Sequence, residues 1–243
     1  MNLLSDYIKE YVAFTKDECD LIIEFYEDNL EYVSASQVYS AQNHATLHSV
    51  DIQGRKSNQL HIPFDAPIDG LIEQKINQYF AQYHWDIGKM FDDEWQKNQD
   101  KDMPGYRHLD VPTNLLENFV YEDEGYTIVK YDADDGFFEW HFDRLDDDRK
   151  SRQRAFSCLI YLNDEFEEGE TDFYWHKIVP KTGKIAFFPS GHHWQHKGRQ
   201  PKNGCKYVIT TWLHQAIKDG KADLPDGADY QAYINQFLSL IHI

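Results

Sequence analysis

An apolar pattern with a helical period begins close to the N-terminus. Thr15 precedes this pattern and stands three residues before Glu18, a spacing at which the two side chains can cap the first backbone amides of a helix. The sequence therefore predicts a helix over residues 16–30. The residues expected to form its buried face are Leu21, Ile22, Phe25 and Tyr26.

A second helical pattern follows, and a long polar stretch comes after it. A helix is predicted to begin near Pro67, because proline is tolerated in a first helical turn, and to end near residue 84. Residues 92–118 contain turn formers and show no clear period, so we expect a long loop there. The apolar face of this second helix consists of Leu71, Ile72, Ile76, Tyr79 and Phe80.

The pattern changes from helical to extended after residue 118. Short runs of β-branched and aromatic residues are separated by turn formers such as Asn-Asp, Glu-Gly and Thr-Gly. Short strands joined by brief turns are typical of a sandwich or jelly roll, not of a parallel α/β sheet. A short helix is predicted for residues 228–241. The expected strands are 126–131, 155–162, 171–175, 184–188 and 206–213.

The composition is that of an acidic globular protein. Of the 243 residues, 41% are hydrophobic and 15% are aromatic, which is enough to build a core. The formal net charge of −18 repels nucleic-acid phosphates and anionic lipids, since proteins bind both chiefly through Lys and Arg. We therefore expect neither nucleic acid nor a membrane as a partner.

The cysteines and the hydropathy profile suggest a compartment. Cys19, Cys158 and Cys205 are too few and too scattered for a disulfide framework or a CxxC metal site. The first residues lack the apolar stretch of a signal peptide, and no run approaches the roughly 18 apolar residues of a membrane span. The sequence predicts a soluble, cytoplasmic protein.

Two candidate metal ligands lie in the segment Trp-His-Phe-Asp. In an extended strand alternate side chains share a face, so His141 and Asp143 point the same way. His196 is a third candidate, because a jelly roll can bring a late strand beside an early one. His192 and His193 compete with it for this position. Two histidines and one carboxylate leave open coordination positions and suit non-haem Fe(II).

Lys206 begins the last predicted strand, where a lysine is ordinarily solvated. We expect it instead inside the barrel, where an ammonium group needs an anionic partner such as a dicarboxylate cofactor. Alternation predicts which residues of two strands share a face with the site. These are Ser157, Leu159 and Tyr161 on one strand, and Lys206, Val208, Thr210 and Trp212 on the other.

Together these motifs resemble those of the Fe(II)/2-oxoglutarate-dependent oxygenases, and within them the prolyl 4-hydroxylase branch. The resemblance is strongest over residues 125–214, and the segment FTKDECDLII and residues 55–57 extend it toward the N-terminus. The chain departs from the family at Glu168, where a glycine is frequent, and at Phe138, where a tyrosine is frequent. The matching motifs are Tyr131 before His141-x-Asp143, Tyr161-Leu162-Asn163-Asp164, Gly169-Glu170-Thr171-x-Phe173, Gly183 leading to Phe188-Pro189, and His196 ten residues before Lys206.

The resemblance implies a fold and a set of site residues. The fold would be a double-stranded β-helix, with His141, Asp143 and His196 as the iron ligands. Lys206 would bind the distal carboxylate of 2-oxoglutarate. The implied cofactors are Fe(II), 2-oxoglutarate as cosubstrate, O₂, and ascorbate as reductant. The other implied residues of the cosubstrate pocket are Tyr161, which would hydrogen-bond that carboxylate, Thr171 and Tyr131.

The resemblance also implies an activity. The expected reaction hydroxylates a C–H bond, with prolyl residues of a peptide or protein as the first candidate substrate and succinate and CO₂ as coproducts. Arg55, Trp212 and His214 are substrate-side candidates, although packing alone would explain each of them about equally well. The same chemistry on a free amino acid or another small molecule is an alternative. A non-catalytic jelly-roll binding module is another.

The expected architecture is α+β with a mainly β core, in a single domain over residues 1–243. Residues 1–118 are expected to give helical and irregular support, and residues 119–215 to form the double-stranded β-helix catalytic core. Residues 216–243 are expected to form a C-terminal tail with the short helix.

Overall fold

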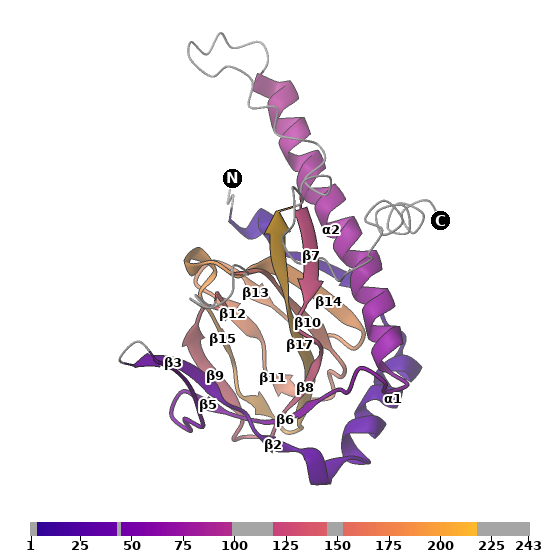
Figure 1. The fold of residues 1–243 in the computed structure, drawn as a ribbon, viewed down its shortest axis with the longest axis vertical. Coiled ribbons are helices and arrows are strands. Elements are labelled where there is room, and N and C mark those ends of the chain that lie inside the picture. Colours follow the sequence, from indigo (N-terminus) through magenta and orange to yellow (C-terminus); the bar gives the residue numbers. More distant parts are fainter. Residues whose placement is uncertain (1–3, 43–44, 99–118, 145–152, 218–243) are drawn as a thin grey trace.

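The computed structural model describes residues 4–42, 45–98, 119–144 and 153–217 (Figure 1). The helix predicted for 228–241 and most of the predicted 92–118 loop lie outside these residues. The described part is mainly β, as expected, with two long helices beside two larger sheets.

The larger of these sheets has eight strands and is antiparallel throughout. All five strands predicted from the pattern are present with shifted ends and contain buried residues, and four of them belong to this sheet. The strand order of the eight-stranded sheet is β1 (Lys9–Val12), β14 (Lys184–Pro189), β10 (Gln153–Tyr161), β17 (Lys206–Ile217), β8 (Thr127–Tyr131), β6 (Asn58–His61) and β2 (Ser34–Ala35), and β7 (Phe119–Asp123) also pairs with β17.

The second sheet has five strands and carries much of the candidate site. Its central pair, β15 and β9, aligns His196 with His141. Its order is β13 (Lys177–Ile178), β12 (Thr171–Phe173), β15 (His196–Gly198), β9 (Phe137–His141) and β5 (Arg55–Lys56). Two smaller pairs complete the strands, β3 (Val38–Gln42) with β4 (Ala45–Ser49) and β11 (Glu167–Glu168) with β16 (Pro201–Lys202).

The first helix, α1 (Lys16–Glu27), starts with the predicted capping box. The Thr15 hydroxyl accepts a hydrogen bond from the Glu18 amide at 3.2 Å, and the Glu18 carboxylate accepts one from the Thr15 amide at 2.7 Å. The helix ends three residues earlier than predicted. The assignment of Leu21 to the buried face was wrong, because its side chain is 50% exposed and Cys19 is buried instead.

The second helix, α2 (Asp69–Asn98), has 30 residues and is longer than predicted. Residues 92–98 belong to it, so the predicted loop begins too early. In Figure 1 the last turns of α2 extend beyond the sheets. Helix-forming residues such as Glu94 and Lys97 sustain the helix without a periodic signal.

Alternation along the strands separates two hydrophobic clusters. The larger cluster lies between the eight-stranded sheet and the helices, and it contains Cys158 and Ile160 of β10. The smaller cluster lies on the other face of that sheet, toward the second sheet, and contains Tyr161 and Val208. The predicted faces of β10 and β17 are therefore confirmed, and the second face is the one on which the candidate site lies.

Four strands of these sheets come from the N-terminal part of the chain and were not predicted. β1 pairs with β14, β6 pairs with β8, β2 pairs with β6, and β5 pairs with β9. They extend both sheets, so this part of the chain contributes strands in addition to the expected helical and irregular support.

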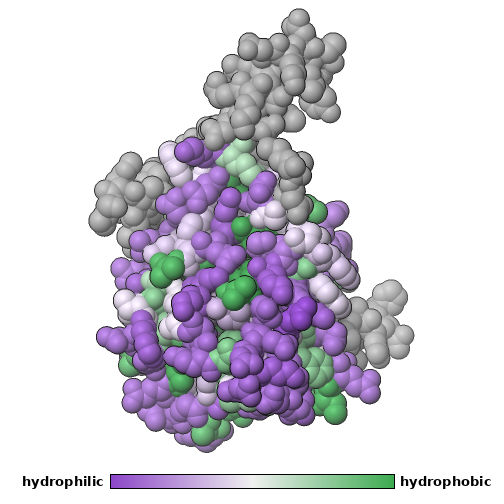
Figure 2. Space-filling view, turned by 180° about the vertical axis from the view of Figure 1, so that it is seen from behind, coloured by the Kyte–Doolittle hydropathy of each residue, from purple (hydrophilic) through white to green (hydrophobic). Residues whose placement is uncertain are grey.

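Figure 2 shows that the back of the molecule is mostly hydrophilic, with apolar side chains in small patches. No helix in the described ranges combines the length and the apolar character that crossing a bilayer requires.

Candidate active site

Three predicted metal ligands meet at one point of the second sheet. His141 is the last residue of β9, Asp143 follows two residues later, and His196 is the first residue of β15. One ligand atom from each lies within 4.8 Å of the others. The pairing of β9 with β15 brings the two histidines together, as expected for a chain that folds back on itself. His192 and His193 lie in a short 3₁₀ helix, outside this cluster.

Backbone carbonyls fix the orientation of both imidazoles. Nδ1 of His141 donates to the Glu139 carbonyl at 2.7 Å, and Nδ1 of His196 donates to the Trp194 carbonyl at 3.0 Å. With the proton on Nδ1, the Nε2 atom of each ring carries a lone pair. Each Nε2 lies 3.6 Å from an oxygen of Asp143. Both rings therefore present a free lone pair to the same space as the carboxylate.

The Asp143 carboxylate is buried and held by hydroxyl groups. The Ser157 hydroxyl donates to its Oδ2 at 2.7 Å, and the Ser190 hydroxyl lies 2.9 Å from that of Ser157. Burial alone would raise the pKa of Asp143, but the two imidazoles and the Ser157 hydrogen bond lower it below its usual range. Burial lowers the pKa of His141, and neighbouring His196 lowers it further. Asp143 is therefore anionic and His141 neutral near pH 7.

This donor set fits a divalent cation. Within the described ranges no Lys or Arg nitrogen lies within 4.0 Å of the Asp143 carboxylate, although Arg154 favours its charged form from farther away. A buried carboxylate without a cationic partner is costly, and a metal ion would supply that partner. Two nitrogens and one oxygen on one side of a shared space leave other positions open, which suits Fe(II).

Lys206 is the second buried charge of the site. Its side chain is 2% exposed, its ammonium donates to the Gly169 carbonyl at 2.9 Å, and it lies 4.4 Å from the ring centre of Tyr131. Among the described residues no carboxylate lies within 4.0 Å of it. Burial lowers the pKa of Lys206 to about 7, although Glu170 acts in the opposite direction. An ammonium group in this setting fits an anionic ligand.

Two hydroxyl groups line the same pocket as Lys206. The hydroxyls of Tyr161 and Thr171 are 2.7 Å apart, and both side chains are buried. Tyr161 lies on β10 and Thr171 on β12, so the two sheets meet here. The structure thus places Tyr161, Thr171, Tyr131 and Lys206, all predicted for the cosubstrate, in one pocket.

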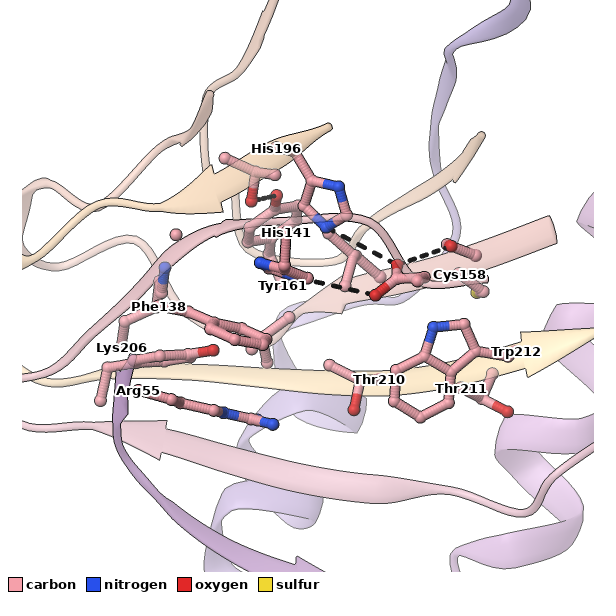
Figure 3. A pocket seen from close by; sticks show the side chains of 17 residues that line it. Arg55, Phe138, His141, Cys158, Tyr161, His196, Lys206, Thr210, Thr211 and Trp212 are labelled. Carbon is pink, nitrogen blue, oxygen red and sulfur yellow. Dashed lines mark hydrogen bonds and ion pairs between the residues drawn. The ribbon is translucent and has the colours of Figure 1, made fainter. Parts of the chain in front are cut away.

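The pocket encloses a small cavity of about 50 Å³. Seventeen residues line it, and Figure 3 shows His141 and His196 at one side, with Trp212 and Arg55 along the wall. The predicted metal and cosubstrate residues all belong to this lining.

The three substrate-side candidates differ in their placement. Arg55 and Trp212 line the pocket, whereas His214 is outside that lining and contacts the carboxylate of Glu124. Arg55 is 8% exposed, and its Nε donates to the Ser57 hydroxyl at 3.0 Å. The structure thus brings two of the three candidates to the pocket, and their contact with substrate stays a prediction.

Two contacts that support the site were not predicted, although Ser157 was placed on the correct face of its strand. The Arg154 guanidinium lies 3.5 Å from the ring centre of Trp212, donates to the Asp143 carbonyl at 3.3 Å and binds both oxygens of Glu124 at 2.6 Å. The second support is Ser157, which donates to the Asp143 carboxylate. An arginine or serine in a strand carries no sequence pattern that would identify either contact.

Comparisons with known proteins agree with this geometry. Residues 126–214 match the family model of the 2OG-Fe(II) oxygenase superfamily. A protein of Acanthamoeba polyphaga mimivirus named "Putative prolyl 4-hydroxylase" is 24% identical over 218 residues, which cover 75% of this chain and 89% of the relative.

Solved structures share the fold. The viral collagen prolyl hydroxylase of Paramecium Bursaria Chlorella virus-1, in complex with 2-oxoglutarate, has a TM-score of 0.53 at 20% identity and covers 86% of this chain and 96% of its own. A Pseudomonas putida prolyl-4-hydroxylase has a TM-score of 0.52 at 16% identity, with coverage of 85% and 91%. A Trichoplax adhaerens prolyl hydroxylase, in complex with a hypoxia inducible factor peptide fragment, has a TM-score of 0.51 at 13% identity, with coverage of 87% and 84%.

These findings confirm the resemblance inferred from the motifs. Over residues 126–214 the chain is similar to the 2OG-Fe(II) oxygenase superfamily and is prolyl 4-hydroxylase-like, and the protein is an oxidoreductase of the hydroxylase class. The family implies Fe(II), 2-oxoglutarate and O₂ as the reactants at its centre.

Proposed function

We propose that the protein hydroxylates a C–H bond of prolyl residues in a peptide or protein, using Fe(II), 2-oxoglutarate and O₂ and releasing succinate and CO₂. The observation that carries this proposal is the meeting of the ligand triad and a buried, unpaired ammonium group in one pocket. When bound, Fe(II) with 2-oxoglutarate and O₂ supplies the oxidising chemistry. Ascorbate would serve as the reductant that keeps the iron ferrous.

In this proposal His141, Asp143 and His196 hold the iron. The Glu139 and Trp194 carbonyls keep the two Nε2 lone pairs toward the metal position. Ser157 keeps the Asp143 carboxylate oriented through its hydrogen bond. A carboxylate ligand also occupies the position that a halide would need, which favours hydroxylation over halogenation.

Lys206 binds the distal carboxylate of 2-oxoglutarate in this proposal, since that carboxylate supplies the anion that the buried ammonium lacks. Tyr161 donates its hydroxyl to the same carboxylate, and Thr171 lines the pocket beside it. Tyr131 contributes its ring face below the ammonium group. The two ends of the cosubstrate would thereby be held by the metal and by Lys206.

The proposal extends to the architecture and to the substrate side. The eight-stranded and five-stranded sheets would be the two sheets of a double-stranded β-helix, built as a single domain around a catalytic core over 119–215. Arg55 and Trp212, which line the pocket, would contact the substrate, and His214 would act near its rim beside Glu124. The hypoxia inducible factor peptide in the Trichoplax neighbour supports a peptide substrate.

The test is mass spectrometry of candidate peptides incubated with the protein, Fe(II), ascorbate and 2-oxoglutarate. The expected result is an oxygen added to a prolyl residue, together with succinate, and loss of both in His141→Ala. Free amino acids and small molecules form the second set of substrates. Succinate release stimulated by that set alone would contradict the peptide proposal.

A further inference from the structure

Three planar groups form a stack at the side of the metal triad. The ring of Phe138 lies parallel to the His141 imidazole, with ring centres 3.5 Å apart and an angle of 17° between the planes. On its other face the Arg55 guanidinium carbon lies 4.6 Å from the Phe138 ring centre. Figure 3 shows Phe138 between Arg55 and His141. The order of the stack is therefore Arg55, Phe138, His141.

A backbone irregularity creates this stack. In a regular strand, residues three apart point to opposite faces, so Phe138 and His141 would be separated. The pairing of β9 with β15 shifts instead, since His141 aligns with His196 and Phe138 with Gly198. Three steps along β9 therefore correspond to two along β15, which is a β-bulge. This bulge brings Phe138 to the pocket side beside His141.

The two histidines differ in their surroundings. His196 packs against Phe173 and Phe188, at ring-centre distances of 5.3 and 5.0 Å, and its side chain is 5% exposed. The side chain of His141 is 19% exposed, and Phe138 and His196 are its ring contacts. The carbonyl bond at Nδ1 fixes one edge of the His141 ring but leaves it free to tilt about that bond. A parallel ring against its face removes this freedom.

We propose that Phe138 is a positioning residue that holds the His141 imidazole in the orientation required for metal coordination, with Arg55 clamping Phe138 from the opposite face. The inference rests on the proposed function, because it assumes a metal at the triad. Phe138 would therefore increase the affinity for the metal. Arg55 would do so through Phe138, without contacting the substrate.

The test is a titration of the ligand-free protein with Co(II), followed through the visible absorption of the bound ion. Phe138→Leu keeps an apolar side chain but removes the stacked ring. We expect about 10- to 100-fold weaker Co(II) binding, as for other groups that orient a metal ligand, and an altered absorption spectrum. Phe138→Tyr retains the ring and should restore both. Phe137→Leu, the same change one residue earlier on β9 and outside the pocket lining, should bind like the wild type.

Arg55→Met supplies a second variant that leaves Phe138 in place. It should weaken Co(II) binding in the wild-type background and have no further effect in the Phe138→Leu background, since Arg55 acts on His141 through Phe138. Additive losses in the double variant would overturn this route. Wild-type affinity and spectrum in Phe138→Leu would overturn the positioning role itself.

Co(II) binding by His141→Ala shows whether the proposed metal site itself is wrong. If His141→Ala binds Co(II) as the wild type does, the triad is not the metal site, and the inference falls with it. If His141→Ala loses Co(II) while Phe138→Leu does not, the metal site stands and only the positioning role is refuted.

Discussion

Replacing Lys206 with methionine is expected to stabilise the ligand-free protein while weakening its binding of 2-oxoglutarate. The side chain is buried, and no carboxylate of the described residues lies within 4.0 Å of its ammonium. The difference between its usual pKa of 10.5 and about 7, at about 1.4 kcal/mol per pH unit, corresponds to about 5 kcal/mol against keeping the charge in the ligand-free fold.

The expected gain is smaller than this value, for two reasons. At pH 7 the lysine can shed its proton, and Lys206→Met leaves the Gly169 carbonyl without its donor, which costs about 1 to 3 kcal/mol. We expect the free energy of unfolding to rise by about 1 to 4 kcal/mol, as when other buried charges are replaced by apolar groups. Affinity for 2-oxoglutarate should fall about 10- to 100-fold, through loss of a charge-assisted contact of roughly 1.5 to 3 kcal/mol.

The effect of Lys206 on the stability of the ligand-free protein should depend on pH. Because the pKa of Lys206 is lower in the folded protein than in the unfolded chain, the unfolded chain binds the proton more tightly between about pH 7 and 10.5. The contribution of Lys206 to stability therefore improves as the pH rises through this window. The advantage of the methionine variant should shrink accordingly.

The assays are urea unfolding of the ligand-free protein and anaerobic calorimetry of 2-oxoglutarate with Mn(II) in place of iron. Lys130→Met is the matched control, since Lys130 on the neighbouring strand is paired with Glu27 at 2.8 Å. Its loss should lower stability without changing 2-oxoglutarate affinity. A Lys206→Met variant that is less stable and binds 2-oxoglutarate as the wild type does would refute the reasoning.

Three further substitutions test other parts of the structure. The imidazole of His84 is buried without a hydrogen-bond partner in the described structure, and burial lowers its pKa to about 4. As the pH falls, the unfolded chain therefore takes up a proton on this residue before the folded protein does. The free energy of unfolding should fall by up to about 3 kcal/mol from pH 6.5 to 4. His84→Phe should flatten this urea-unfolding profile, and an unchanged slope would contradict the assignment. Thr15→Ala removes the cap of α1 and should cost about 1 kcal/mol in urea unfolding, whereas unchanged stability would show that the cap is not needed. Ser157→Ala frees the Asp143 carboxylate and should weaken Co(II) binding about tenfold; equal affinity would show that the hydrogen bond does not orient the ligand.

The features that the sequence predicted best are the faces of the strands, which follow from alternation, and the metal ligands, which follow from motifs. The strands around Ser157 and Lys206 were placed on the correct faces, because alternate residues of a strand must point to opposite sides. The convergence of His141 with His196 followed from the motifs and from a chain that folds back, and the pairing of β9 with β15 confirms that they meet.

The features that were missed depend on contacts between distant segments. Strands β1, β5 and β6 have two to four residues each, too few to show a period, and their pairing with later strands decides that they form. The exposure of Leu21 depends on which face of α1 meets the sheet, which the cap alone does not determine. The stack of Phe138 on His141 requires a β-bulge, and no residue pattern in β9 predicts this bulge.

The most direct measurement of the central claim is anaerobic equilibrium dialysis with Fe(II) of the wild type, His196→Ala and His192→Ala. His192 is the control, because it is a neighbouring histidine outside the triad. The wild type and His192→Ala should each bind one Fe(II) tightly per chain, and His196→Ala should lose this Fe(II). Undiminished Fe(II) binding in His196→Ala, or its loss in His192→Ala, would contradict the assignment of the metal centre.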